Sequence, residues 1–119
     1  MTEPVRIPVL DVNVYFFYDR DTAIQFIKDN SSSEDEWKVL EKSMGVCYEL
    51  DAKDGYTYRM MCVFDGERNT AIHEAVHMAW FIIHHCGMRV ARDNHEILAY
   101  LTAWIADRAI SGQTQKPPI

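Results

Sequence analysis

The residues best suited to chemistry form the pentapeptide His73-Glu74-Ala75-Val76-His77, which has the pattern H-E-x-x-H. Histidines four positions apart project from the same face of a helix, so His73 and His77 could bind one zinc ion through their imidazole rings. Glu74 would lie beside that ion and accept a proton from a bound water. The flanking residues are uncharged and include no proline, which predicts an unbroken apolar helix in which the glutamate needs a partner.

A catalytic zinc ion usually takes three protein ligands and a water, so the motif requires a third ligand. The longer pattern H-E-x-x-H-x-x-G-x-x-H is absent. Trp80 stands at its glycine position and Ile83 at its third histidine position. The third ligand must therefore come from another segment of the chain.

The candidates for this third ligand lie at the start of the next predicted helix. Glu96 follows His77 by nineteen positions, which leaves room for the motif helix to end at Gly87 and for a second helix to return antiparallel to it. Glu96 is the first candidate for the third ligand and His95 is the second. Tyr100, one turn after Glu96, is a candidate hydrogen-bond donor to a developing oxyanion.

Structural roles compete with these assignments. Asp93 and Glu96 fit a capping box at a helix start, so Glu96 could be a ligand, a cap or both. His95 fits a surface position. The two motif histidines could be core residues, but that interpretation leaves the motif glutamate unexplained.

Composition and charge predict a single globular domain. The chain has 119 residues, of which 48% are apolar and 25% are charged, and we expect residues 1–112 to form the domain and residues 113–119 to form a flexible tail. Residues 1–67 hold 14 acidic and 7 basic residues, a net charge of −7, whereas residues 68–119 hold 4 and 5, a net charge of +1. The acidic first half argues against nucleic acid as a partner.

The cysteines and the termini indicate a cytoplasmic protein. The chain has three cysteines, Cys47, Cys62 and Cys86, and none of them forms a C-x-x-C pair. An odd number of separate cysteines suits a reducing compartment. No secretory signal is recognisable at the start of the sequence, and no apolar stretch is long enough to cross a membrane. We therefore expect a peptide or protein as substrate or partner, and no membrane.

Hydrophobic patterns and capping residues predict the elements that position the motif. The predicted elements are a strand over residues 7–17, a short helix capped by Asp19, a second short helix from Ser33 to Gly45, a hairpin of strands 46–50 and 56–64, the motif helix from Asn69 or Thr70 to Gly87, and a last helix from Asp93 or Asn94. Trp37, Leu40 and Met44 should point inward from the second helix. The motif helix is apolar almost all round, with Ile72, Val76 and Trp80, so it should be the buried centre of the domain.

The residues His73, Glu74, His77 and Glu96 together resemble the zincin metallopeptidases whose third zinc ligand is a glutamate. Residues 96–101 are similar to the ligand helix of small peptidases encoded by mobile elements, which cleave repressors. Residues 73–96 also resemble small phage-encoded proteins assigned as metallopeptidases. The resemblance implies a minimal zincin-like α+β fold, with a small antiparallel or mixed sheet packed on the motif helix and a ligand-bearing helix after it.

This resemblance implies a zinc-dependent peptidase of phage or prophage origin, with Zn²⁺ as the cofactor and Glu74 as the general base. A peptide substrate would add as an extra strand to the sheet, and the strand from Tyr56 to Phe64 is the candidate edge. The chain is too short for the second lobe of larger zincins. Substrate binding should therefore be shallow, and it could depend on a partner or on a homodimer.

Two other functions fit the sequence. The first is a catalytically idle binding protein of a phage, which would inhibit a host defence complex or bind a virion component. It would act through an acidic surface that includes Glu34, Asp35 and Glu36. The second is a zinc-free helical module in which the motif histidines belong to the core.

Overall fold

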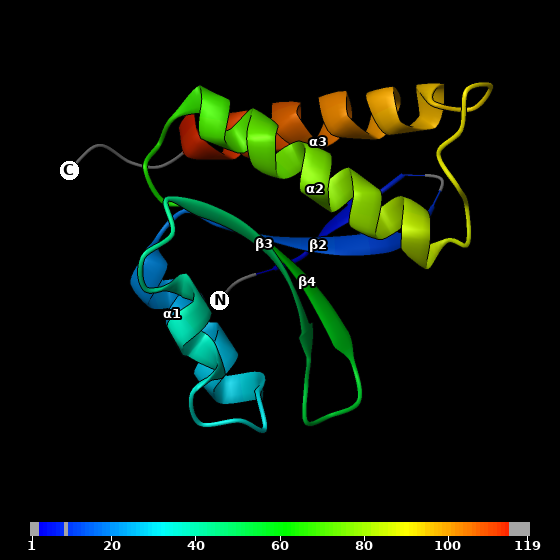
Figure 1. The fold of residues 1–119 in the computed structure, drawn as a ribbon. Helices are drawn as coiled ribbons and strands as arrows, with labels where there is room; N and C mark the ends of the chain where they lie inside the picture. The colour runs from blue at the N-terminus through cyan, green and yellow to red at the C-terminus, as the bar shows by residue number, and fades with distance from the viewer. Residues whose placement is uncertain (1–2, 9, 115–119) are drawn as a thin grey trace.

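The computed structural model describes residues 3–8 and 10–114, and it has the α+β architecture that the sequence predicts. In the described part of the chain, three α-helices and one short 3-10 helix, η1, accompany a four-stranded mixed sheet (Figure 1). In chain order the elements are β1 (Val5–Ile7), β2 (Val12–Phe17), α1 (Arg20–Asn30), η1 (Glu36–Leu40), β3 (Gly45–Asp51), β4 (Thr57–Val63), α2 (Arg68–His85) and α3 (Glu96–Thr114).

The strand order β1-β2-β4-β3 makes β4 an inner strand of the sheet. It pairs antiparallel with β3 and parallel with β2, while β1 pairs antiparallel with β2. The predicted hairpin is confirmed, but the prediction that its second strand is a free edge is wrong. Residues 60–63 are apolar without alternation and buried on both faces of the sheet, which is typical of an inner strand. The free edge of the hairpin belongs to β3.

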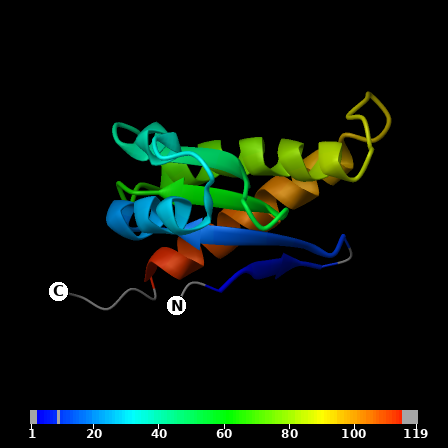
Figure 2. The same ribbon diagram turned by 90° about the horizontal axis from the view of Figure 1, so that it is seen from below.

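The two faces of the sheet carry separate cores. Alternate residues of one strand point to opposite faces, so Met61 and Val63 pack beneath α2 and α3, whereas Met60 and Cys62 pack against α1 and η1. Figures 1 and 2 show α2 and α3 together, apart from α1. The helix pair that carries the motif thus has its own core, independent of the one under α1.

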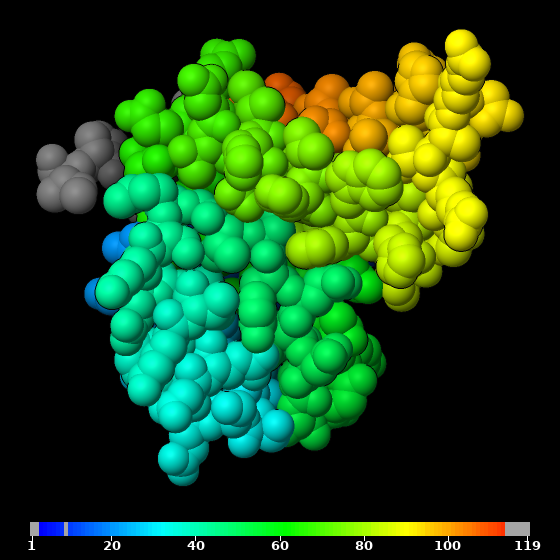
Figure 3. Space-filling model, viewed as in Figure 1, coloured from blue at the N-terminus to red at the C-terminus, as the bar shows by residue number. Residues whose placement is uncertain are grey.

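Helix α2 is amphipathic rather than buried all round. Its buried residues follow helical spacing and form one stripe, which consists of Ala71, Glu74, Ala75, Met78, Ala79, Ile82 and Ile83. Ile72, Val76 and Trp80 lie outside this stripe and are 42%, 38% and 46% exposed. The prediction that they are buried is wrong because the sheet and α3 cover only one side of α2. Figure 3 shows atoms of α2 at the surface, between those of β3 and α3.

The N-terminal segment forms two strands where the sequence predicts one. Pro8 accepts a hydrogen bond from the backbone N–H of Leu10 in a turn, and Asp11 has a left-handed φ of 56°. The turn reverses the chain, so β1 pairs with β2 instead of extending it. Proline cannot donate a strand hydrogen bond, which is the local reason for the break.

The structure confirms the predicted start of α1 but not the extent of the second and last predicted helices. Asp19 caps α1, because its carboxylate accepts the backbone N–H of Thr22 at 2.9 Å, a bond that contributes about 1 kcal/mol. The predicted second helix is only the 3-10 helix η1, and Met44 is 58% exposed rather than inward. Helix α3 runs to Thr114, two residues into the predicted tail, whose remaining residues 115–119 lie outside the described part.

Gly45 allows β3 and α2 to approach closely. A Cβ atom at this position would lie 2.5 Å from Cγ2 of Thr70 and 3.1 Å from Cγ of Glu74. It would also lie 3.1 Å from the backbone oxygen of Cys62, which cannot move aside without disturbing the sheet. Any larger residue at position 45 must therefore push α2 away from β3.

We expect Gly45→Ala to lower the free energy of unfolding by about 1–3 kcal/mol, the usual cost of overpacking. Thr70→Ser removes Cγ2 but retains the hydroxyl that donates to Asp65 at 2.7 Å. The double variant should therefore recover part of the loss, as measured by urea unfolding in a double-mutant cycle. Equal stability of wild type and Gly45→Ala would show that β3 and α2 are not in close contact.

Candidate metal centre

The motif histidines converge on the exposed side of α2. The unbroken helix places His73 and His77 one turn apart, and their Nε2 atoms are 3.3 Å from each other. Two nitrogen ligands of a tetrahedral zinc ion, each at about 2.0–2.1 Å from it, are also roughly 3.3 Å apart. The separation of the two Nε2 atoms therefore fits a shared zinc ion.

The same separation also permits a hydrogen bond between the two rings. A neutral imidazole donates through one nitrogen and accepts through the other, so one Nε2 could donate to its neighbour. The ring planes are inclined at 67° with centroids 5.0 Å apart, so the rings are not stacked. Metal binding would replace one exposed hydrogen bond, which costs little in water.

Glu74 lies in the buried stripe of α2, next to this pair. The residue is 7% exposed, which confirms that the motif places a glutamate in an apolar environment. Its Oε2 lies 3.9 Å from Nε2 of His73, too far for a hydrogen bond. Its Cγ faces Gly45. The carboxylate is thus held between the histidine pair and the free-edge strand β3.

Cys47 contacts the backbone of Glu74, and the charge of Glu74 also acts on Cys62, although the sequence did not predict either relation. The thiol of Cys47 donates to the backbone oxygen of Glu74 at 2.9 Å. Burial raises the pKa of Cys47, and the charge of Glu74 adds to the increase. Burial, followed by the charge of Glu74, raises the pKa of Cys62 to about 12. Both thiols are therefore protonated in the metal-free chain at neutral pH. No local signal predicts this contact, because it depends on how β3 packs on α2.

The predicted third ligands do not join the histidine pair. No group of three His, Cys, Asp or Glu side chains in residues 3–8 and 10–114 could hold a metal ion. Helix α2 continues for eight residues beyond His77, about 12 Å along its axis, before the loop that leads to Glu96. Glu96 and His95 are both exposed, and His95 lines a groove between α2 and α3. Tyr100 is 55% exposed, and its role as an oxyanion donor remains a prediction.

The acidic residues of the predicted binding surface are partly engaged within the chain. The carboxylate of Glu36 accepts hydrogen bonds from the hydroxyls of Ser31 and Tyr48. Asp35 forms an ion pair with Lys38 at 3.3 Å. Glu36 therefore stabilises the segment around η1, and no observation favours this surface as a binding site over an ordinary solvated one.

Comparison with known protein families, with curated proteins and with solved structures finds no match to this chain. The predicted assignment to the zincins is therefore corrected. No family supports it, and the described residues lack the three-ligand group that defines such a site. Among the helices of the described ranges, none is long and apolar enough to span a bilayer.

The cysteine environments predict selective thiol reactivity. Cys86 is exposed, whereas the raised pKa values of Cys47 and Cys62 keep those thiols protonated. We expect one fast-reacting thiol per folded chain with a disulfide reagent at pH 8, and all three thiols to react after denaturation. Cys86→Ser should remove the fast phase. Rapid modification of a second thiol in the folded variant would contradict the packing of β3 on α2.

The raised pKa of Cys62 also makes the stability of the fold depend on pH. Cys62 has a pKa of about 12 in the folded chain instead of the usual 9.0, so the folded state retains a proton that the unfolded state loses. Its contribution to stability is present below about pH 9 and is lost as the pH rises toward 12. Cys62→Ala should reduce the loss of stability between these two pH values, as measured by urea unfolding. An unchanged pH profile in this variant would contradict the assignment.

Proposed function

We propose that the chain binds a divalent metal ion, with zinc as the first choice, through Nε2 of His73 and His77, and that it hydrolyses peptide bonds with Glu74 as the general base. The observation that carries the proposal is the 3.3 Å separation of the two Nε2 atoms, which matches the spacing of two ligands on one tetrahedral ion. Two exposed side chains on a continuous helix reach this geometry without distortion of the backbone.

Glu74 provides the second element of the proposal. Its side chain is fixed by close packing against β3, and Oε2 is the oxygen nearest to the histidine pair. A bound zinc ion would lower the pKa of a water molecule and polarise a peptide carbonyl. Glu74 would accept the proton of that water at Oε2 and pass it to the leaving amine. A catalytic zinc ion usually has three protein ligands, so with two histidines the remaining positions on the ion would go to water and substrate.

The free edge of β3 offers a place for a peptide substrate. Its first residues lie against the turn of α2 that carries Glu74, through Gly45 and Cys47. An extended peptide could pair with this edge through backbone hydrogen bonds. The histidine side chains are exposed, and neither lines the cavities between β2 and β4 or between α2 and α3. Substrate contacts would therefore come from the strand edge rather than from a deep pocket.

The first test is the metal content of protein that has been incubated with zinc and dialysed. We expect one zinc per chain in the wild type and a loss of that zinc in His73→Ala and in His77→Ala, because each variant removes one of two ligands. His84→Ala is the matched control, since it removes an exposed imidazole from the same helix outside the pair. Zinc binding that is lost equally in the control, or retained in both motif variants, would overturn the assignment.

The second test separates metal binding from catalysis. Glu74→Gln keeps the size of the side chain but removes the proton acceptor, so we expect zinc to be retained and turnover of unstructured peptides to fall by at least about a hundredfold. Mass spectrometry of the products would locate the cleaved bonds. Loss of zinc in this variant would make Glu74 a ligand instead of the base. Full turnover would contradict the mechanism.

A further inference from the structure

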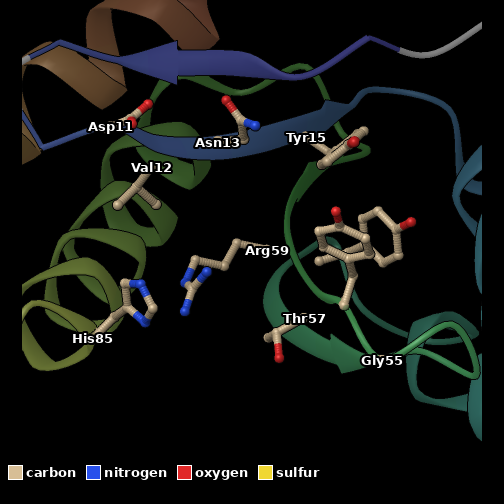
Figure 4. Close-up of a pocket in the computed structure, with 10 residues that line it drawn as sticks. Asp11, Val12, Asn13, Tyr15, Gly55, Thr57, Arg59 and His85 are labelled. Atoms are coloured by element: carbon tan, nitrogen blue, oxygen red, sulfur yellow. The ribbon is translucent and has the colours of Figure 1, made fainter.

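A second site lies in the corner where β2 and β4 separate. The two strands pair only from Tyr15 to Phe17 and from Met60 to Cys62, although both extend further toward their N-termini. Figure 1 shows the β3–β4 hairpin turning away from β2. A cavity of about 560 Å³ fills the resulting corner, and residues of β2, of β4 and of the turn before β4 line it together with His85 (Figure 4).

Arg59 is the buried cation of this cavity. The residue is only 9% exposed, and its guanidinium extends from β4 toward His85 (Figure 4). Within the described part of the chain, its Nε is buried without a hydrogen-bond partner. Oε2 of Glu49 lies 3.3 Å from Nε, within ion-pair distance but without hydrogen-bond geometry. A buried Nε–H that lacks a hydrogen bond is costly unless another group satisfies it.

The other charges around the cavity leave room for an anion. Asp11 lines the cavity but forms an ion pair with Arg6 at 2.5 Å. Arg59 and His85 line this cavity, and they also line a second one of about 490 Å³ beside Glu49. The guanidinium thus lines both cavities, and among the described residues only Glu49 lies in ion-pair contact with it.

Tyrosine rings line another part of the same cavity, and because Tyr58 precedes Arg59 in β4, its ring points to the opposite face of the sheet from the guanidinium. The ring of Tyr58 contacts Tyr15 edge-on at 5.5 Å and lies 6.1 Å from Tyr56. Tyr56 is 69% exposed, so its ring covers no core and is available to a ligand. Aromatic rings bind other planar rings, and a guanidinium binds carboxylate or phosphate through paired hydrogen bonds.

We propose that this cavity binds a small aromatic anion, with the carboxylate or phosphate group on Arg59 and the ring extending through the corner between β2 and β4 to Tyr56. The site is separate from the histidine pair and does not depend on the proposed metal chemistry. His85 would add a hydrogen bond to the same oxyanion from the last turn of α2.

The test is an NMR titration of the full chain at constant ionic strength with benzoate, phenyl phosphate and inorganic phosphate. We expect saturable shifts of the amide signals of residues 13, 55–59 and 85, and of the Nε–Hε signal of Arg59. Tighter binding of benzoate or of phenyl phosphate would identify the oxyanion. Benzyl alcohol, which has the ring without the charge, should bind more weakly by about tenfold or more.

Variants assign the binding to the named groups. Arg59→Gln should weaken binding of all three anions by about tenfold or more, whereas Arg108→Gln, which removes an exposed cation from α3, should leave it unchanged. Tyr56→Ala changes an exposed residue, so it tests the site even if Arg59→Gln does not fold. Tyr56→Ala should weaken the binding of benzoate and of phenyl phosphate but not the binding of inorganic phosphate. Non-saturable shifts in the wild type, or unchanged affinity in Arg59→Gln or Tyr56→Ala, would overturn the proposal.

Discussion

The close contact between β3 and α2 determines where Glu74 lies relative to the histidine pair, and the proposed chemistry depends on that placement. Gly45 has no side chain, so the backbone of β3 reaches the turn of α2 that carries Thr70 and Glu74. This contact buries the glutamate, whereas His73 and His77 on the adjacent face of the helix remain exposed. The site therefore depends on a glycine in a strand as much as on the motif itself.

The phase of α2 explains how one pentapeptide provides both a buried and an exposed group. Successive helical residues turn by about 100°, so Glu74 falls within the stripe that packs on the sheet while His73 and His77 share a face just outside it. The carboxylate is held rigid by the core, and the imidazoles are free to bind a ligand. Such a division suits a base that must keep its position while a metal ion and substrate exchange with solvent.

The sequence was sufficient for the elements with strong local signals. The Asp19 cap, the β3–β4 hairpin and the long motif helix follow from capping residues, turn residues and periodicity. The unbroken apolar run of β4 is the local signal of an inner strand, so the prediction of an edge there overlooks a pattern that the sequence contains. The exposure of Trp80 had no such signal, because it depends on how little of α2 its neighbours cover.

The candidate site divides in the same way. The i, i+4 spacing predicts the convergence of His73 and His77, since one helix fixes both. A third ligand from α3 depends on how α2 and α3 pack and on the path of the ten residues between His85 and Glu96. No local pattern predicts that packing, and the structure does not bring Glu96 to the histidine pair. The contacts of Cys47 and Arg59 depend on the sheet as a whole, so no local pattern could reveal them.

The most direct measurement is the histidine side-chain ¹⁵N spectrum of the chain during addition of zinc. The account predicts that Nε2 of His73 and of His77 shift together and reach saturation at one equivalent. The signals of His84, His85 and His95 should remain unchanged, because these imidazoles lie in the last turn of α2 and in the loop before α3, outside the pair. Zinc-dependent shifts at those three histidines, or none at His73 and His77, would contradict the central claim.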